Sequence, residues 1–423
     1  MDDAGASLQA EMSAMGRAAK AAAQTLRLAD ASARTRAIAA MAKAVRAEGP
    51  AILAANAGDV AAARAAGLEA AMVDRLLLDE VRLEGVAQAL ETIAAIPDPV
   101  GEEIARWTRP NGLDIARVRT PIGVIGIIYE SRPNVTADAA ALCVRAGNAV
   151  ILRGGSECLA TNLAIHAALA RGLAEAGLPE ASVQIVRTAD RAAVGLMLTG
   201  LEGAVDLIIP RGGKSLVARV QAEARAPVLG HLEGLNHVFL HAGADLAKAI
   251  DIAVNAKLRR VSVCGAAETL LVDRAAAGRL LPPVASALAE AGCELRGDAA
   301  ARAIAPMREA TEADWTTEYL APVISVAVVD GVEGAAAHIA RYGSAHTDAI
   351  VTEDAKAAEA FVALVDSAIV LVNASTQFAD GGEFGFGAEI GIATDRLHAR
   401  GPVGAEQLTT YKYVVRGTGQ TRP

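Results

Sequence analysis

The residue best suited to covalent chemistry is Cys264, which lies in Arg259–Gly265 between a predicted helix and a predicted strand. Two cations, Arg259 and Arg260, precede it and a glycine follows it. Positive charge and exposed backbone amides favour the thiolate, which is the nucleophilic form of cysteine. The segment therefore indicates a catalytic thiol, and a buried structural cysteine is the alternative.

The other three cysteines are Cys143, Cys158 and Cys293. They are far apart, form no CxxC pair, and share no zinc-ligand spacing with histidines. We expect buried structural thiols there, with neither a disulfide framework nor a metal site.

A donor for a developing negative charge is predicted at Asn134, in the turn after the apolar run Val124–Tyr129. Attack of a thiolate on an acyl group creates an oxyanion, which needs a hydrogen-bond donor. The backbone N–H of Cys264 is the second candidate donor. An asparagine that merely suits a turn is the alternative.

Two glycine-rich loops each leave a predicted strand and enter a predicted helix. Such loops allow close backbone approach, and a helix N-terminus with Arg or Lys attracts phosphate. Neither matches GxGxxG, and plain tight turns are the alternative, but their places at successive strand ends favour a dinucleotide. Arg153 with Ser156 suits a 2′-phosphate, which favours NADP over NAD. The candidate cofactor-binding residues of these loops are Arg153, Gly154, Gly155, Ser156, Arg211, Gly212, Gly213, Lys214 and Ser215.

The elements that must position these groups follow from hydrophobic periodicity. Residues 6–96 repeat apolar positions every three or four residues, which predicts a helical bundle. Asn111-Gly112 between two alternating runs predicts a hairpin. From Val124 onward, short apolar runs alternate with helical stretches, which predicts parallel sheets covered on both faces.

The fold class predicted is α/β, with two three-layer domains and a small β arm. The alternation restarts after about Ala242, which marks a second domain. The expected division is a cofactor-binding domain of 1–103 and 121–241 with a return segment at about 385–408, a catalytic domain of 242–384, and an oligomerisation arm of 104–120 and 409–423.

Charge and composition exclude several classes of protein. The chain has 423 residues, 40 basic and 49 acidic, for a formal charge of −9 without blocks of like charge. Nucleic acid is therefore an unexpected partner. The acidic amino terminus lacks a secretory pattern and no stretch is long and apolar enough for a membrane span, so we expect a cytoplasmic protein.

Several long segments resemble the γ-glutamyl phosphate reductases of the aldehyde dehydrogenase superfamily. The resemblance runs in order from the amino terminus to about Gln420, and Gly265 departs from it, because that family usually has Asn there. The segments are Pro121–Thr136, Ala149–Ser156, Asp206–Ser215, Val261–Val272, Val372–Thr376 and His398–Pro402.

This resemblance implies an NADPH-dependent reduction of L-glutamyl 5-phosphate to L-glutamate 5-semialdehyde in proline biosynthesis, through a thioester on Cys264. It places the aldehyde dehydrogenase fold on the chain and Asn134 as oxyanion donor. Glu318, in Glu318–Val323, is similar to the superfamily's ribose-binding acid, with a solvated acid as the alternative. A homo-oligomer and an association with glutamate 5-kinase are further expectations. No metal is required.

Substrate-binding candidates are polar residues of loops that we expect near the thiol if strand ends converge on one cleft. Arginine binds carboxylate and phosphate oxygens through two parallel hydrogen bonds. Surface ion pairs are the alternative. The candidates are Glu130, Ser131, Arg132, Asn373, Ser375, Thr376, His398 and Arg400.

Two other functions remain open from the sequence. An ordinary NAD(P)-dependent aldehyde dehydrogenase would hydrolyse its thioester with water, and Glu233 could serve as its base. A nucleotide-binding scaffold would keep the fold with a silent thiol.

Overall fold

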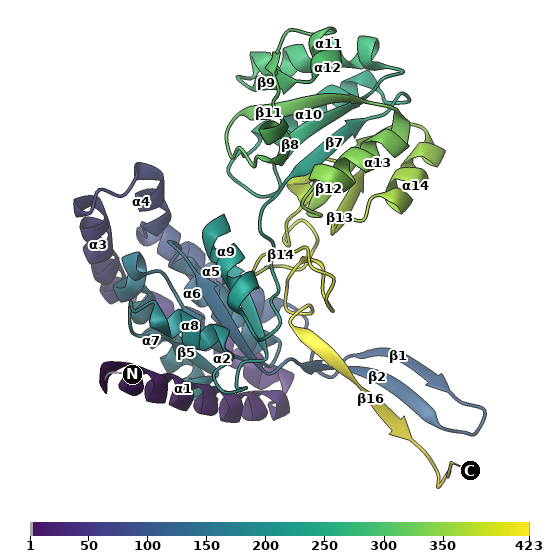
Figure 1. Ribbon diagram of the computed structural model, residues 1–423. Coiled ribbons are helices and arrows are strands. Elements are labelled where there is room, and N and C mark those ends of the chain that lie inside the picture. The colour runs from purple at the N-terminus through teal and green to yellow at the C-terminus, as the bar shows by residue number, and fades with distance from the viewer. Residues whose placement is uncertain (1–2, 423) are drawn as a thin grey trace. The chain divides into compact units, whose positions relative to one another are not determined.

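The computed structural model describes residues 3–422, which form two compact units (Figure 1). The first unit contains the chain up to Gly230, Gly385–Gly391 and the chain from Val403 onward. The second unit contains His231–Phe384 and Ile392–Pro402. The chain therefore leaves the first unit after Gly230, re-enters it at Gly385, leaves it again after Gly391 and returns at Val403.

Helices dominate the first half of the first unit, as the periodicity predicts. Asp30 and Asp79 cap α2 and α5 by accepting backbone N–H bonds from the first turn, which satisfies donors that have no partner within a helix. The five helices are α1 (Asp3–Leu28), α2 (Ala31–Ala47), α3 (Gly49–Ala65), α4 (Ala70–Leu76) and α5 (Glu80–Ala95).

A four-stranded parallel sheet of order β5-β4-β3-β6 forms the centre of the first unit. All six residues of β3 are buried, as expected for a parallel strand covered on both faces. Its strands are β3 (Val124–Tyr129), β4 (Ala149–Arg153), β5 (Val183–Ile185) and β6 (Leu207–Arg211), and its helices are α6 (Asn134–Arg145), η1 (Ser156–Cys158), α7 (Leu159–Glu175), η2 (Glu180–Ser182), α8 (Ala192–Leu198) and α9 (Lys214–Glu223).

A separate antiparallel sheet extends from the first unit (Figure 1). It joins the predicted hairpin, β1 (Glu103–Thr108) and β2 (Asp114–Pro121), to the carboxyl-terminal strand β16 (Thr409–Arg416). Tyr411 and Tyr413 of β16 are about half exposed, at 46% and 56%. We call this three-stranded sheet the arm.

The second unit contains a seven-stranded parallel sheet of order β10-β9-β11-β8-β7-β12-β13. Its strands are β7 (Asn236–Leu240), β8 (Ala267–Asp273), β9 (Glu294–Gly297), β10 (Arg308–Glu309), β11 (Val323–Val329), β12 (Thr347–Val351) and β13 (Ile369–Val372). Its helices are α10 (Leu246–Leu258), α11 (Ala277–Glu290), α12 (Ala299–Arg302), η3 (Glu312–Thr316), α13 (Gly331–Tyr342), α14 (Ala355–Leu364) and η4 (Thr376–Phe378). A short pair, β14 (Ile392–Ala393) and β15 (Gly401–Pro402), completes it.

The division between the units differs from the sequence analysis at β7 and in the expected return segment 385–408, of which Ile392–Pro402 belongs to the second unit. Val238–Leu240 was assigned to the first domain, but β7 pairs with β8 and β12 in the second unit. The chain crosses at Gly230, before this strand. None of the helices within residues 3–422 combines the length and hydropathy needed to cross a bilayer.

Candidate active site

Cys264 lies in a tight turn between α10 and β8. The N–H of Ala266 donates to the carbonyl of Val263 at 3.0 Å, which closes the turn around the thiol. The Cys264 side chain is half-buried and packs against Ile369, Ala379 and Ile392. Partial exposure is what a nucleophilic thiol requires.

The buried amide of Asn236, at the start of β7, holds this turn in place. Its Nδ2 donates to the carbonyl oxygens of Cys264 at 2.6 Å and Ala266 at 2.9 Å. Its Oδ1 accepts from the N–H of Thr347 at 3.1 Å. Asn236 is fully buried, so one neutral side chain links the starts of β7, β8 and β12. The geometry of the thiol turn therefore depends on Asn236.

Gly234 allows a second segment to pass against the same turn. A Cβ on Gly234 would lie 2.1 Å from the carbonyl oxygen of Cys264, a distance no side chain tolerates. The N–H of Gly234 donates to Glu318 at 2.9 Å. Glu318 thus holds the segment around Gly234, which contacts the thiol turn. The expected contact of Glu318 with a ribose stays a prediction.

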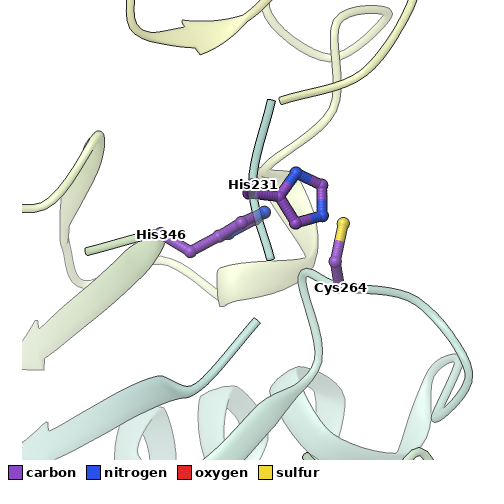
Figure 2. Close-up of side chains that lie close together, drawn as sticks. All are labelled: His231, Cys264 and His346. Atoms are coloured by element: carbon purple, nitrogen blue, oxygen red, sulfur yellow. The ribbon is translucent and has the colours of Figure 1, made fainter. Parts of the chain in front are cut away.

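Two imidazoles lie beside the thiol, as Figure 2 shows. A nitrogen of His231, a nitrogen of His346 and the sulfur of Cys264 lie within 4.8 Å of one another. His231 comes from the segment before β7, and His346 directly precedes β12. The rings of the two histidines meet edge to face, with centroids 4.8 Å apart.

Gly265 has little room for the asparagine that the resemblance leads one to expect. A Cβ there would lie 3.1 Å from the carbonyl oxygen of Thr376 and 3.6 Å from the Cβ of Ala379. The glycine therefore allows η4 to approach the thiol turn closely.

The remaining cysteines are free and buried. Burial raises the pKa of Cys143 far above its usual range, that of Cys158 to about 12 and that of Cys293 to about 11. Thiols with such pKa values are poor nucleophiles near neutral pH. The structure thus supports structural roles at these positions.

The cations before Cys264 are both exposed. Arg259 provides the C-cap of α10, and Gln377 donates to the carbonyl oxygens of Ala256 and Arg260 at 2.9 and 3.3 Å. An amide side chain thus satisfies carbonyls at the carboxyl end of this helix. The influence of the two arginines on the thiol stays a prediction.

In the first unit, the predicted cofactor loops follow β4 and β6, the two strands that flank β3 in one sheet. Gly154-Gly155 follows β4, and Gly212-Gly213 follows β6. Arg153 donates to the carbonyl oxygens of Gly154 and Ala189 at 2.9 and 3.2 Å. Ser156, Gly212, Gly213, Lys214 and Ser215 are exposed, and Arg211 is half-buried.

Carboxylates accept from one backbone N–H of these loops and from the segment that follows β3. Glu130 accepts from the N–H of Gly213 at 2.8 Å. Glu157 accepts from both the N–H and the hydroxyl of Ser131 at 2.8 and 2.7 Å. The predicted phosphate-binding amide and the predicted substrate hydroxyl thus have acidic partners within their own unit. Arg132, from the same segment, is exposed.

Asn134 lies at the first position of α6, after β3, and its side chain is exposed. Its Nδ2 donates to Asp138 at 2.9 Å, one turn along the helix. Burial raises the pKa of Asp138 to about 6. This bond orients the amide, and its role as an oxyanion donor stays a prediction.

The other substrate candidates lie in the second unit at different places. Asn373 bonds both backbone groups of Thr352 at the end of β12, whereas the Thr376 carbonyl lies against Gly265. The Ser375 hydroxyl accepts from the N–H of Gln377 at 3.2 Å. Of this group, the structure brings Thr376 to the thiol turn.

Arg400 and His398 lie between β14 and β15. Arg400 forms an ion pair with Asp366 at 2.6 Å and also donates to the Asp366 backbone carbonyl. His398 is exposed. Arg400 therefore has a structural partner, and substrate binding by either residue stays a prediction.

Comparison with known proteins places this architecture in a family. The sequence pattern of the aldehyde dehydrogenase family matches residues 3–319. A γ-glutamyl phosphate reductase of Caulobacter vibrioides is 76% identical over 413 residues, covering 97% of this chain and 100% of that protein. One from Rhodopseudomonas palustris is 60% identical and covers 100% of this chain and 98% of its own length.

Solved structures agree. The crystal structure of a γ-glutamyl phosphate reductase from Thermotoga maritima matches with a TM-score of 0.95 and 44% identity, covering 98% of this chain and 100% of that one. An acetylating aldehyde dehydrogenase from Geobacillus thermoglucosidasius, 19% identical with a TM-score of 0.71, shares the fold. The predicted aldehyde dehydrogenase-like α/β fold is confirmed. The chain belongs to the aldehyde dehydrogenase family and, within it, to the γ-glutamyl phosphate reductases.

Proposed function

We propose that this chain reduces L-glutamyl 5-phosphate to L-glutamate 5-semialdehyde with NADPH, releasing phosphate and supplying proline biosynthesis. The observation that carries the mechanism is the Cys264 thiol. Among the four cysteines it is the half-buried one, and Asn236 fixes its turn. The names of the relatives support the substrate.

The first chemical step belongs to Cys264 and His231. The Nδ1 of His231 lies 2.7 Å from the carbonyl oxygen of Ile392, and because a carbonyl only accepts, Nδ1 carries the proton. Nε2 then has a lone pair and takes the thiol proton. The sulfur forms a bond to the acyl carbon, the bond from that carbon to the phosphate oxygen breaks, and a thioester remains.

The oxyanion of this step needs donors, and we assign the Asn134 amide and the Cys264 N–H to it. Bound NADPH supplies the hydride that reduces the thioester carbonyl. The carbon–sulfur bond then breaks, the aldehyde leaves, and His231 returns its proton to the thiolate. Cys264 and His231 thus return to their starting protonation states.

The glycine-rich loops of the first unit suit NADPH. The Nε of Arg153 is buried and has no hydrogen-bond partner within residues 3–422. One N–H of this guanidinium can therefore donate to a ligand. Arg153 and Ser156 would hold the 2′-phosphate, and the loop at Arg211–Ser215 would face the pyrophosphate. Glu318 would accept ribose hydroxyl bonds.

Substrate binding is assigned to the polar loops named from the sequence. Arg132 and Arg400 would bind carboxylate or phosphate oxygens, and Glu130 would bind the ammonium group. The remaining assignments are Ser131, Asn373, Ser375, Thr376 and His398.

The arm supports a homo-oligomer. One edge of β16 pairs with β2, and the side chains of Tyr413 and Val415 are 56% and 54% exposed. An exposed strand edge with apolar side chains is a template for pairing with another chain. A cytoplasmic location and transfer of the labile substrate from glutamate 5-kinase are part of the same proposal.

The test runs the reaction backwards. NADP reduction is measured with glutamate 5-semialdehyde, with and without inorganic phosphate, on wild type, Cys264→Ala and the control Cys293→Ala. We expect activity that requires phosphate, is lost in Cys264→Ala and is retained in Cys293→Ala. Phosphate-independent oxidation would instead identify the hydrolytic enzyme with Glu233 as base, and activity in Cys264→Ala would refute the covalent mechanism.

A further inference from the structure

The thiol and two imidazoles beside it form a set of metal ligands. The three atoms offered by His231, Cys264 and His346 lie within 4.8 Å of one another (Figure 2). Thiolate sulfur and imidazole nitrogen are the ligands that zinc prefers in proteins. The three residues are far apart in the sequence, so their spacing predicts no metal site.

His346 presents a buried atom that no residue within 3–422 satisfies. Its Nδ1 lies 2.9 Å from the hydroxyl of Thr347. Its Nε2 is buried and has no hydrogen-bond partner in the described part of the chain. The whole side chain is buried, at 0% exposure. A buried polar atom without a partner lowers stability unless a ligand satisfies it.

His231 already has the outer contact typical of metal-bound histidines. Its Nδ1–H donates to the Ile392 carbonyl, which fixes the tautomer and the ring orientation and leaves a lone pair on Nε2. Asn236 and Gly234 hold the Cys264 turn against this pair. Each ligand is thus anchored by a different neutral contact.

The geometry requires little adjustment. Ligand atoms around tetrahedral zinc lie about 3.5 Å apart, because Zn–N and Zn–S bonds are about 2.0–2.3 Å long. Small rotations of the His231 and Cys264 side chains close the remaining separation. Three protein ligands leave the fourth position to water.

We propose that His231, Cys264 and His346 bind one Zn²⁺ ion. The thiol loses its proton and the sulfur lone pair forms the bond to zinc, so the nucleophile is blocked while the metal is bound. Zinc is then a reversible inhibitor, and a chelator restores the free thiol. The inhibitory part rests on the proposed function, whereas the binding part does not.

Co²⁺ reports the ligands directly, because thiolate coordination gives a charge-transfer absorption band. Co²⁺ alone is titrated into the reduced, metal-free full-length protein, and Zn²⁺ is then added to displace it. We expect a band that saturates at one equivalent and disappears with Zn²⁺. Replacing one ligand should weaken Zn²⁺ binding by more than roughly 100-fold, since even an outer-shell partner is worth about 10- to 100-fold.

The variants are Cys264→Ser, His346→Gln and His231→Gln, with His241→Gln and Cys293→Ala as controls. His231 is half-buried, so His231→Gln still tests the site if the buried His346→Gln fails to fold. The three ligand variants should lose the band and the controls should keep it. Iodoacetamide alkylation of Cys264 should slow when Zn²⁺ is bound.

Absence of the band in wild type, or its persistence in both histidine variants, overturns the proposal. Zinc binding in a protein without phosphate-dependent activity would refute the proposed function alone. Phosphate-dependent activity without zinc binding would refute this inference alone.

Discussion

The first unit places its candidate groups at the carboxyl ends of its strands, whereas the second unit places the thiol and its neighbours at the amino ends of its strands. In the first unit, the polar loops follow the carboxyl ends of β3, β4 and β6. In the second, Asn236, His346 and the Cys264 turn lie at the amino ends of β7, β12 and β8. One sheet thus uses the edge where ligands of open α/β folds normally bind, and the other does not.

The difference lies in what each edge can offer. A loop after a strand leads into a helix N-terminus, whose free N–H groups attract anions. A turn before a strand follows a helix C-terminus, whose free carbonyls must be satisfied, as Gln377 does for α10. The thiol edge therefore takes its polar groups from side chains, namely amides and imidazoles. At the carboxyl edge of the first sheet, carboxylates such as Glu130 and Glu157 accept hydrogen bonds from backbone N–H groups instead.

The largest expected effect tests the first unit's contribution to chemistry. Asn134→Ala should lower kcat by roughly 10²- to 10³-fold, because one oxyanion donor is lost. Steady-state kinetics measure it, with KM little changed. Asp138→Asn keeps an acceptor for the Asn134 amide and serves as the control. A normal kcat in Asn134→Ala would show that the first unit binds ligands and supplies no oxyanion donor.

The next effect tests the neutral anchor of the thiol edge. Asn236→Ala leaves buried carbonyls and an N–H without partners, so the free energy of unfolding should fall by about 2–4 kcal/mol. Urea unfolding followed by the fluorescence of Trp315, in a Trp107→Phe background, reports the second unit. Native Cys264 should also react faster with iodoacetamide.

Asn148→Ala is the matched control, because Asn148 is an equally buried amide of the first unit that bonds Gly123 and Leu408. It should cost similar stability and leave Cys264 alkylation unchanged. Equal alkylation rates in both variants would show that Asn236 does not hold the thiol turn.

A smaller effect separates the units by pH. Burial lowers the pKa of His338, in the second unit, to about 3. The unfolded histidine binds a proton below about pH 6.5, so stability is lost as pH falls from 6.5 toward 3, by about 2 kcal/mol at pH 5. His338→Phe should reduce the difference between urea midpoints at pH 7.5 and pH 5, measured through Trp315.

Asp138 of the first unit changes the pH dependence of stability in the opposite direction. Its folded pKa of about 6 exceeds the unfolded value, so its contribution is lost as pH rises through 6. Asp138→Asn should therefore change the pH dependence in the other direction. The same sign in both variants would remove this distinction between the units.

The smallest effect concerns Gly265. An asparagine there brings its Cβ to 3.1 Å from the Thr376 carbonyl, so η4 must shift slightly. Gly265→Asn should lower stability by about 1 kcal/mol, the lower range for overpacking, and retain activity. Gly265→Ala separates steric crowding from new hydrogen bonds. An unchanged unfolding midpoint would show that η4 adapts freely.

Much of the fold could be predicted because buried parallel strands are continuous apolar runs. The apolar run Val124–Tyr129 was predicted with the bounds that the structure gives to β3. The edge strand β10 and its neighbour β9 were missed, since both are short and Glu294–Gly297 carries charges at alternate positions. Edge strands are only half covered, and their sequences lack the apolar signal.

The thiol was predictable and its surroundings were not. Cys264 has local signals, but His231 and His346 reach it through the pairing of β7, β8 and β12. Asn236 donates to backbone carbonyls, which every residue has, so its partners leave no signal in the sequence. The sequence offers Glu233 as a candidate base, whereas the structure places His231, two residues before it, beside the thiol. A histidine directly after Gly230 was the signal that the sequence contained.

The arm has a consequence for how the chain is made. Its central strand β2 pairs with β16, and Arg119 bonds Glu406 across 287 positions of sequence. A growing chain holds β1 and β2 early but cannot finish the sheet until β16 has been synthesised. Only a chain that contains β16 presents the finished arm, so an assembly that uses it selects against subunits truncated before Thr409.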